Sequence, residues 1–182
     1  METIRFLLYG ICFAFVCRGT VPDRDMLNRT KLVKIAEREL GVREATGNND
    51  GPKVEEYLAT VHLKKNAPWC AAFICWLYQQ AGYKEPQTGW SPALFPKGRI
   101  VNEAKPGVVL GIYFPDLKRI AHCGLVTKVK GNWIYSVEGN TNKQGSREGN
   151  GVYRRMRHIR TIKYFSDWTK VMSRTKSNKE IR

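Results

Sequence analysis

The sequence predicts an α+β domain, in which helices from the first half of the chain pack on a small antiparallel β-sheet from the second half. Apolar residues recur at helical spacing up to residue 81, whereas the short apolar stretches typical of strands begin only at residue 108. This order, helices first and strands afterwards, favours the α+β class. The chain has 182 residues, of which 42% are hydrophobic and 26% charged, enough for one folded domain with an ordinary core.

The chain begins with an apolar stretch, residues 6–17, which follows Arg5 in a short polar start. The stretch is shorter than the roughly 20 residues of a membrane-spanning helix and is typical of a secretory signal. We therefore expect residues 1–19 to be a signal peptide and the mature protein to be exported, to the periplasm or the extracellular space. Two alternatives stay open. One is lipidation at Cys17, which would anchor the protein to a membrane, and the other is a core helix.

The first predicted helix covers residues 27–40, where apolar side chains recur at helical spacing with Lys and Glu between them. Asn28 or Thr30 is a suitable N-cap, and Gly41 stands where a glycine commonly follows a helix. A turn cluster at residues 46–51 (TGNNDG) follows.

Two further helices are expected to begin at prolines, because proline is favoured in the first helical position. Pro52 opens a short one. The stretch PWCAAFICWLYQQAG, residues 68–82, forms a longer, buried one that begins at Pro68 and ends at Gly82. Cys70 then lies in the first turn of this third helix.

The second half of the chain is predicted to form the sheet. A long loop over residues 83–106, rich in Pro, Gly and Trp, precedes it, and residues 130–132 form a tight turn between two strands. The chain is polar from residue 173 onward, so we expect a frayed tail over residues 173–182 and the folded domain over residues 20–172. The predicted strands cover residues 108–114, 123–129, 133–137, 151–157 and 162–165.

Cysteine usage points to a free thiol with a function. Without the signal peptide the chain keeps Cys70, Cys75 and Cys123, an odd number that argues against a disulfide framework. Cys70 lies at a helix N-terminus, where unpaired N–H groups and the helix dipole favour the thiolate, which is the nucleophile. Cys75 lies in the middle of the same helix and is interpreted as a small buried hydrophobe.

A histidine and a carboxylate are expected to lie near one another on paired strands. His122 stands at the beginning of one strand, and Glu138 ends the strand that pairs with it through the tight turn. Because an antiparallel pair brings the start of one strand to the end of the next, Glu138 or Asn140 can reach the His122 ring. A cysteine, a histidine and a polar residue that orients it form the general layout for covalent acyl transfer.

Four segments resemble the CHAP family of amidohydrolases and peptidases, part of the papain-like NlpC/P60 group. They are residues 47–52 (GNNDGP), 66–73 (NAPWCAAF), 121–126 (AHCGLV) and 137–141 (VEGNT). The resemblance runs from about residue 30 to residue 160. It implies a papain-like fold and cleavage of amide bonds in peptidoglycan, as an N-acetylmuramoyl-L-alanine amidase or as an endopeptidase of the stem or cross-bridge.

The resemblance also implies a role for each matching residue. Cys70 matches the nucleophile, His122 the general base, Glu138 the residue that orients the histidine, and Asn140 a further polar position of the catalytic group. The substrate is expected to contact Trp69, Trp90, Asn49 and Asp50. Trp133 is a further candidate for the groove, but we favour core packing for it because it sits in a strand.

No cofactor or metal is expected. Some members of the family hold calcium with several aspartates near the cysteine helix, whereas only Asp50 lies near it here. Many members carry Pro-Gly-Asp before the central strand, where this chain has Pro-Gly-Val at residues 106–108. A zinc site made of the three cysteines and His122 is disfavoured, because zinc ligands usually show short paired spacings such as Cys-x₂-Cys.

The charge of the chain suggests an acidic partner. Lys and Arg total 31 against 16 Asp and Glu, a net charge of +15 that would attract an anionic cell wall or membrane surface. A basic nucleic-acid-binding protein is an alternative, but no sequence motif for specific nucleic-acid recognition occurs. A catalytically inactive wall-binding module of the same fold is another, although all motif residues are retained. A monomer is expected.

Overall fold

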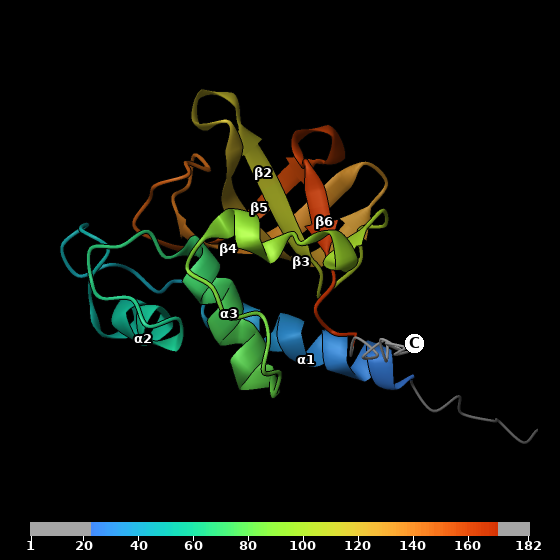
Figure 1. The fold of residues 1–182 in the computed structure, drawn as a ribbon, viewed down its shortest axis with the longest axis horizontal. Helices are drawn as coiled ribbons and strands as arrows, with labels where there is room; N and C mark the ends of the chain where they lie inside the picture. Colours follow the sequence, from blue (N-terminus) through green and yellow to red (C-terminus); the bar gives the residue numbers. More distant parts are fainter. Residues whose placement is uncertain (1–22, 171–182) are drawn as a thin grey trace, which may run out of the picture.

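The computed structural model describes residues 23–170, and over this range the chain forms three α-helices and one six-stranded antiparallel sheet, with the helices packed along one side of it (Figure 1). The predicted α+β class is therefore confirmed. The predicted signal peptide, Cys17 and the tail over residues 173–182 lie outside the described residues. No helix within residues 23–170 is long and apolar enough to cross a membrane.

Helix α1 (Arg24–Arg38) begins earlier than predicted. Its N-cap is Asp23, whose carboxylate accepts a hydrogen bond from the N–H of Asp25, and not Asn28 or Thr30. Thr30 lies inside the helix and donates its hydroxyl to the carbonyl of Met26, one turn back.

Helices α2 (Pro52–Thr60) and α3 (Cys70–Ala81) form where expected. Pro52 opens α2, and Gly82 ends α3 in the left-handed conformation, with φ of 97°. The predicted start of α3 at Pro68 is wrong, because Trp69 is the N-cap and Cys70 the first helical residue. Every residue of α3 from Cys70 to Tyr78 is buried, so this helix forms the centre of the core.

The sheet has the strand order β1-β6-β2-β3-β4-β5, and every pairing is antiparallel. Strand β3 starts at Arg119, earlier than the predicted residue 123, and His122 therefore lies inside it. The predicted loop over residues 83–106 contains β1 and two short 3-10 helices, Ser91–Leu94 and Lys97–Arg99. The strands are β1 (Ile100–Val101), β2 (Val109–Phe114), β3 (Arg119–Lys130), β4 (Trp133–Thr141), β5 (Gly151–His158) and β6 (Tyr164–Ser166).

Side chains alternate between two apolar clusters on the two faces of the sheet. Cys123, Leu125 and Val137 belong to the cluster around α3, whereas Val126 and Ile134 belong to the second cluster. The expected core packing of Trp133 is wrong, because its side chain is 44% exposed. Trp133 shares a face with Val137, but only the Val137 end of that face is covered by the helices.

Candidate active site

Helix α3 places the thiol of Cys70 at its N-terminal end. Because Cys70 is the first helical residue, its backbone N–H has no partner within the helix. The Cys70 Sγ atom lies 3.3 Å from the hydroxyl oxygen of Ser91, which begins the short 3-10 helix Ser91–Leu94 within the long segment after α3. Cys70 is 5% exposed, so the thiol lies at the margin of the core.

Strands β3 and β4 bring a histidine and a carboxylate together, as the sequence predicted. His122 Nε2 lies 2.9 Å from Glu138 Oε2, and both side chains are buried. Their strands pair antiparallel, with Leu125 opposite Val137. The other ring nitrogen, Nδ1, is buried and has no hydrogen-bond partner among the residues that the structure describes. Since Nε2 is occupied by Glu138, Nδ1 is the nitrogen left to act on Cys70.

Two further groups hold the Glu138 carboxylate. Arg157 on β5 donates from Nε to Oε1 at 2.7 Å and from Nη2 to Oε2 at 2.6 Å, a bidentate ion pair. The hydroxyl of Ser136 donates to Oε1 at 2.7 Å. Burial by itself raises the pKa of Glu138, but Arg157 and then His122 outweigh it and lower that pKa to about 2. Glu138 is therefore ionised at every pH near neutrality.

The charges around Cys70 favour a thiolate–imidazolium pair. The Cys123 thiol, followed by the His122 ring, holds the pKa of Cys70 well below its usual value, against burial, which raises it. Burial by itself lowers the pKa of His122, but Cys70 and Glu138 outweigh it and raise that pKa to about 9. Burial raises the pKa of Cys123 well above its usual value, so Cys123 stays a neutral thiol that can donate to the Cys70 sulfur.

Gly124 makes room for this arrangement. A Cβ atom on Gly124 would lie 2.4 Å from Cγ and 3.1 Å from Cδ of Glu138, because the carboxylate side chain crosses directly over the glycine. Only a residue without a side chain therefore lets Glu138 reach the His122 ring.

Replacing Gly124 by Ala is expected to displace the Glu138 carboxylate. The displaced carboxylate would no longer hold the His122 ring, and the acid limb of Cys70 alkylation by iodoacetamide would move to higher pH. Gly107→Ala is the matched control, since its Cβ would lie 3.2 Å from the side chain of Arg29, and its carbonyl contacts Tyr78 in the half of α3 away from Cys70. Equal alkylation profiles for the two variants would contradict the role assigned to Gly124.

Asn140 lies near the nucleophile and does not hydrogen-bond to the His122 ring. In the orientation that satisfies both neighbours, its amide oxygen accepts from the Trp69 N–H at 2.9 Å and its nitrogen donates to the Gly149 carbonyl at 2.9 Å. Asn140 has a φ of 54°, a conformation that asparagine adopts more readily than most residues. Its side chain therefore fixes the backbone immediately before Cys70.

The four residues predicted to bind substrate have different surroundings. Trp69 is fully buried and donates its ring N–H to Glu44, so its ring has no exposed face with which to line a groove. Trp90 is 59% exposed and directly precedes Ser91, the neighbour of the Cys70 thiol.

Asn49 and Asp50 shape the turn before α2. The Asn49 backbone accepts from the N–H of Asn66 at 3.0 Å and donates to the Glu44 carboxylate at 3.0 Å. The Asp50 carboxylate accepts from both the N–H and the hydroxyl of Thr46. These contacts join the turn to the segment that leads into Cys70.

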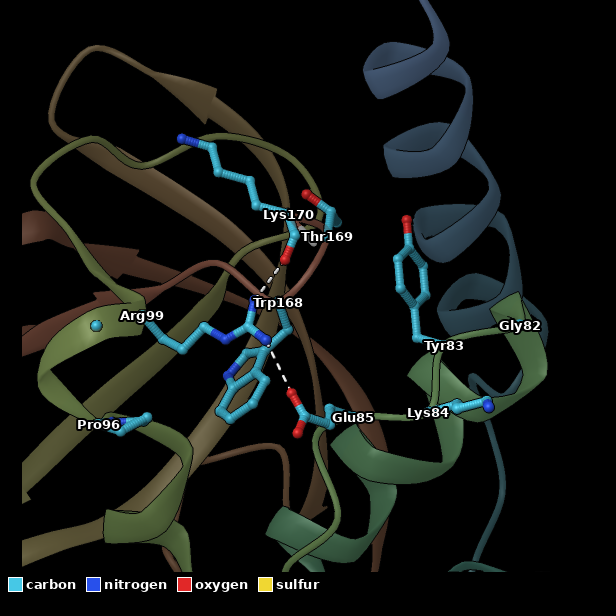
Figure 2. A pocket seen from close by; sticks show the side chains of 10 residues that line it. Gly82, Tyr83, Lys84, Glu85, Pro96, Arg99, Trp168, Thr169 and Lys170 are labelled. Carbon is cyan, nitrogen blue, oxygen red and sulfur yellow. Dashed lines mark hydrogen bonds and ion pairs between the residues drawn. The ribbon is translucent and has the colours of Figure 1, made fainter. Parts of the chain in front are cut away.

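The two hollows described on the surface lie away from the cysteine. The larger, of about 770 Å³, lies beyond the C-terminal end of α3, where Figure 2 shows Arg99 between the Trp168 ring and the Glu85 carboxylate, with Tyr83 to the side. Its lining includes Gly82, about 18 Å along α3 from Cys70. The second, of about 580 Å³, lies between α1 and α3. Neither is lined by Cys70, His122 or Glu138.

Three polar residues that contact Cys70 or Glu138 were not predicted from the sequence: Ser91, Ser136 and Arg157. Ser136 had a usable signal, since it stands two residues before Glu138 and therefore shares its face of β4. Ser91 lies in a non-periodic loop and Arg157 on a separate strand, and neither is marked by its local sequence. Cys123 had been considered only as a metal ligand.

The zinc site disfavoured above would need Cys75 as a ligand beside the other two cysteines and His122. Cys75 lies inside α3, where its sulfur exchanges hydrogen bonds with the backbone of Thr88 and where burial raises its pKa to about 11. Within residues 23–170 no group of three His, Cys, Asp or Glu side chains is arranged to hold a metal ion.

Fold and site together define an α+β domain with a buried Cys–His–Glu constellation, of which the cysteine begins a helix and the other two residues lie on adjacent strands. Comparison with protein-family models, with curated proteins and with solved structures finds no match to this chain.

Proposed function

We propose that the protein is a papain-like cysteine hydrolase of the CHAP type that cleaves amide bonds in bacterial peptidoglycan. The observation that carries the reaction class is the buried contact of His122 with Glu138, beside a thiol whose pKa is held well below its usual value. The substrate class rests on the resemblance of the segments around Cys70, His122 and Glu138 to that family. Neither a cofactor nor a metal is required by this chemistry.

The reaction follows from the groups in place. The Cys70 thiolate attacks the scissile carbonyl carbon, and the carbonyl oxygen takes up the negative charge. The backbone N–H of Cys70, left unpaired by the helix start, donates to this oxyanion, an interaction worth about 3 kcal/mol in hydrolases. His122 then donates its proton to the leaving amine. Water, deprotonated by the same ring, releases the acyl group and restores the thiolate.

Digestion of purified peptidoglycan tests the proposal directly. Wild-type protein is incubated with walls of several cross-link types under reducing conditions, beside Cys70→Ala as the matched control. We expect soluble fragments from the wild type alone, and mass spectrometry of their new termini would name the amide bond that is cut. Absence of release by the wild type from all the walls would contradict a peptidoglycan substrate.

Ser91→Ala is expected to weaken the nucleophile without abolishing it. A hydrogen bond to a charged group contributes about 1.5–3 kcal/mol, so loss of the Ser91 hydroxyl should move the acid limb of Cys70 alkylation to higher pH by about one unit or more. Ser166→Ala is the matched control, because Ser166 is also buried but its hydroxyl has no partner in the described part of the chain. An unchanged acid limb in Ser91→Ala would mean that the hydroxyl does not act on the thiolate.

A further inference from the structure

One end of the helix-facing side of the sheet is basic, aromatic and uncovered. Register places Trp133 between Lys130 and His158, and Tyr135 between Lys128 and Met156. The Trp133 ring lies edge-on to His158 with centroids 5.2 Å apart, and the Lys128 ammonium lies 5.9 Å from the Tyr135 ring centre. We call these six side chains the basic face: Lys128, Lys130, Trp133, Tyr135, Met156 and His158.

The basic face has almost no acidic neighbours along the chain. No Asp or Glu occurs between residues 117 and 137, and none between residues 149 and 166, where five Lys or Arg stand. The acid of β4 itself, Glu138, points to the opposite side of the sheet and is buried against Arg157. Arg154, beside the basic face, pairs with Glu37 at 3.1 Å in an exposed contact. The positive charge of the basic face is therefore not neutralised by the strands around it.

The basic face also exposes large apolar surface. Met156 is 53% exposed and Trp133 44% exposed, side by side with the lysines. A soluble polyanion would require the charges alone, whereas a bilayer offers anionic headgroups to lysine and a less polar layer beneath them to Trp and Met. Tryptophan in particular is favoured at that boundary, because its ring is amphipathic.

We propose that the basic face docks on the surface of an anionic phospholipid bilayer. Lys130 and His122 lie in the same strand, β3, eight residues or about 26 Å apart. The cysteine site, which the proposed function makes the reactive centre, therefore lies at the other end of the strand, and docking of the basic face does not involve it.

Co-sedimentation with vesicles tests the docking. The probes are vesicles of phosphatidylcholine with or without phosphatidylglycerol. The wild type is compared with a variant that carries both Lys128→Glu and Lys130→Glu. Each basic side chain near an anionic surface contributes several-fold to binding, so we expect the double variant to lose at least about tenfold in affinity for phosphatidylglycerol vesicles. The matched control is Lys64→Glu with Lys65→Glu, which makes the same change of charge at two exposed lysines outside the basic face.

Trp133→Ala separates a bilayer from a soluble polyanion. We expect it to weaken vesicle binding several-fold and to leave binding to a soluble glycerol-phosphate polymer or to DNA unchanged. Three outcomes would each overturn the proposal. These are equal losses of vesicle affinity in the two double lysine variants, equal binding of the wild type to both kinds of vesicle, and unchanged vesicle binding in Trp133→Ala. Cys70→Ala should bind vesicles like the wild type, so failure of the hydrolase proposal and failure of docking are distinguishable.

Discussion

Replacing His122 by Asn is expected to lower the rate of amide hydrolysis at neutral pH by at least about 10⁴-fold, as loss of the base does in hydrolases that use such a unit. In the wild type the thiolate is present above the lowered pKa of Cys70, and the imidazolium persists below about pH 9. Hydrolysis should therefore follow a bell-shaped pH profile, with its alkaline limb near pH 9. Without the ring, only the hydrogen bonds from Cys123 and Ser91 oppose the effect of burial on the pKa of Cys70, so the thiolate appears at higher pH than in the wild type.

Alkylation by iodoacetamide measures the thiolate without any substrate. We expect Cys70 to react at pH 6 in the wild type, while Cys75 and Cys123, whose pKa values burial raises, stay unreactive in the folded protein. In His122→Asn the reaction of Cys70 should move to higher pH. His62→Asn is the matched control, since His62 is exposed and its ring contacts the side chain of Gln87, which is also exposed. A wild-type profile in His122→Asn would show that the ring does not set the state of Cys70.

The Cys–His–Glu constellation was predictable because each of its members is marked by its neighbours in the sequence. Cys70 follows a helix start, and His122 and Glu138 lie on two strands joined by a tight turn whose position fixes which residues meet. The turn and the helix periodicity depend on residues that are close together in the chain, so both can be recognised in the sequence. Strand pairing alone allowed either Glu138 or Asn140 to orient the histidine, and the residue that contacts the ring is Glu138.

The parts that escaped prediction depend on contacts between distant segments. β1 pairs with β6, a partner that no local pattern specifies. Arg157 lies opposite Ile134 in the β4–β5 register, and its side chain contacts Glu138, four residues further along β4. Trp133 was assigned to the core from its strand alone, whereas its exposure depends on where α1 and α3 stop covering the sheet.

Replacing Glu138 by Gln is expected to destabilise the fold by about 3 kcal/mol or more and to lower hydrolysis by roughly 10⁴-fold. The guanidinium of Arg157, whose side chain is 14% exposed, would lose the carboxylate that neutralises it. The His122 ring would lose both its anchor and the charge that keeps it protonated. The loss of activity and the loss of stability then have separable causes.

The shifted pKa values of Glu138 and His122 make the free energy of unfolding depend on pH, in opposite directions for the two residues. The folded pKa of Glu138, about 2, lies below its ordinary value near 4.5, so its contribution to stability is present above about pH 4.5 and is lost as pH falls toward 2. His122, raised to about 9 from 6.5, contributes stability that is complete below about pH 6.5 and is lost as pH rises through 9. Denaturant unfolding between pH 3 and 7 should therefore show a shallower acid decline in Glu138→Gln than in the wild type.

A second substitution distinguishes a structural carboxylate from a positioning one. In Glu138→Gln with Arg157→Met the buried positive charge is removed together with its partner, and the free energy of unfolding should recover in part, since neutral replacement of a buried ion pair costs little. Hydrolysis should not recover, because the His122 ring still lacks a carboxylate at Nε2. Recovery of both stability and activity in the double variant would mean that Glu138 serves only to neutralise Arg157 and does not position the ring.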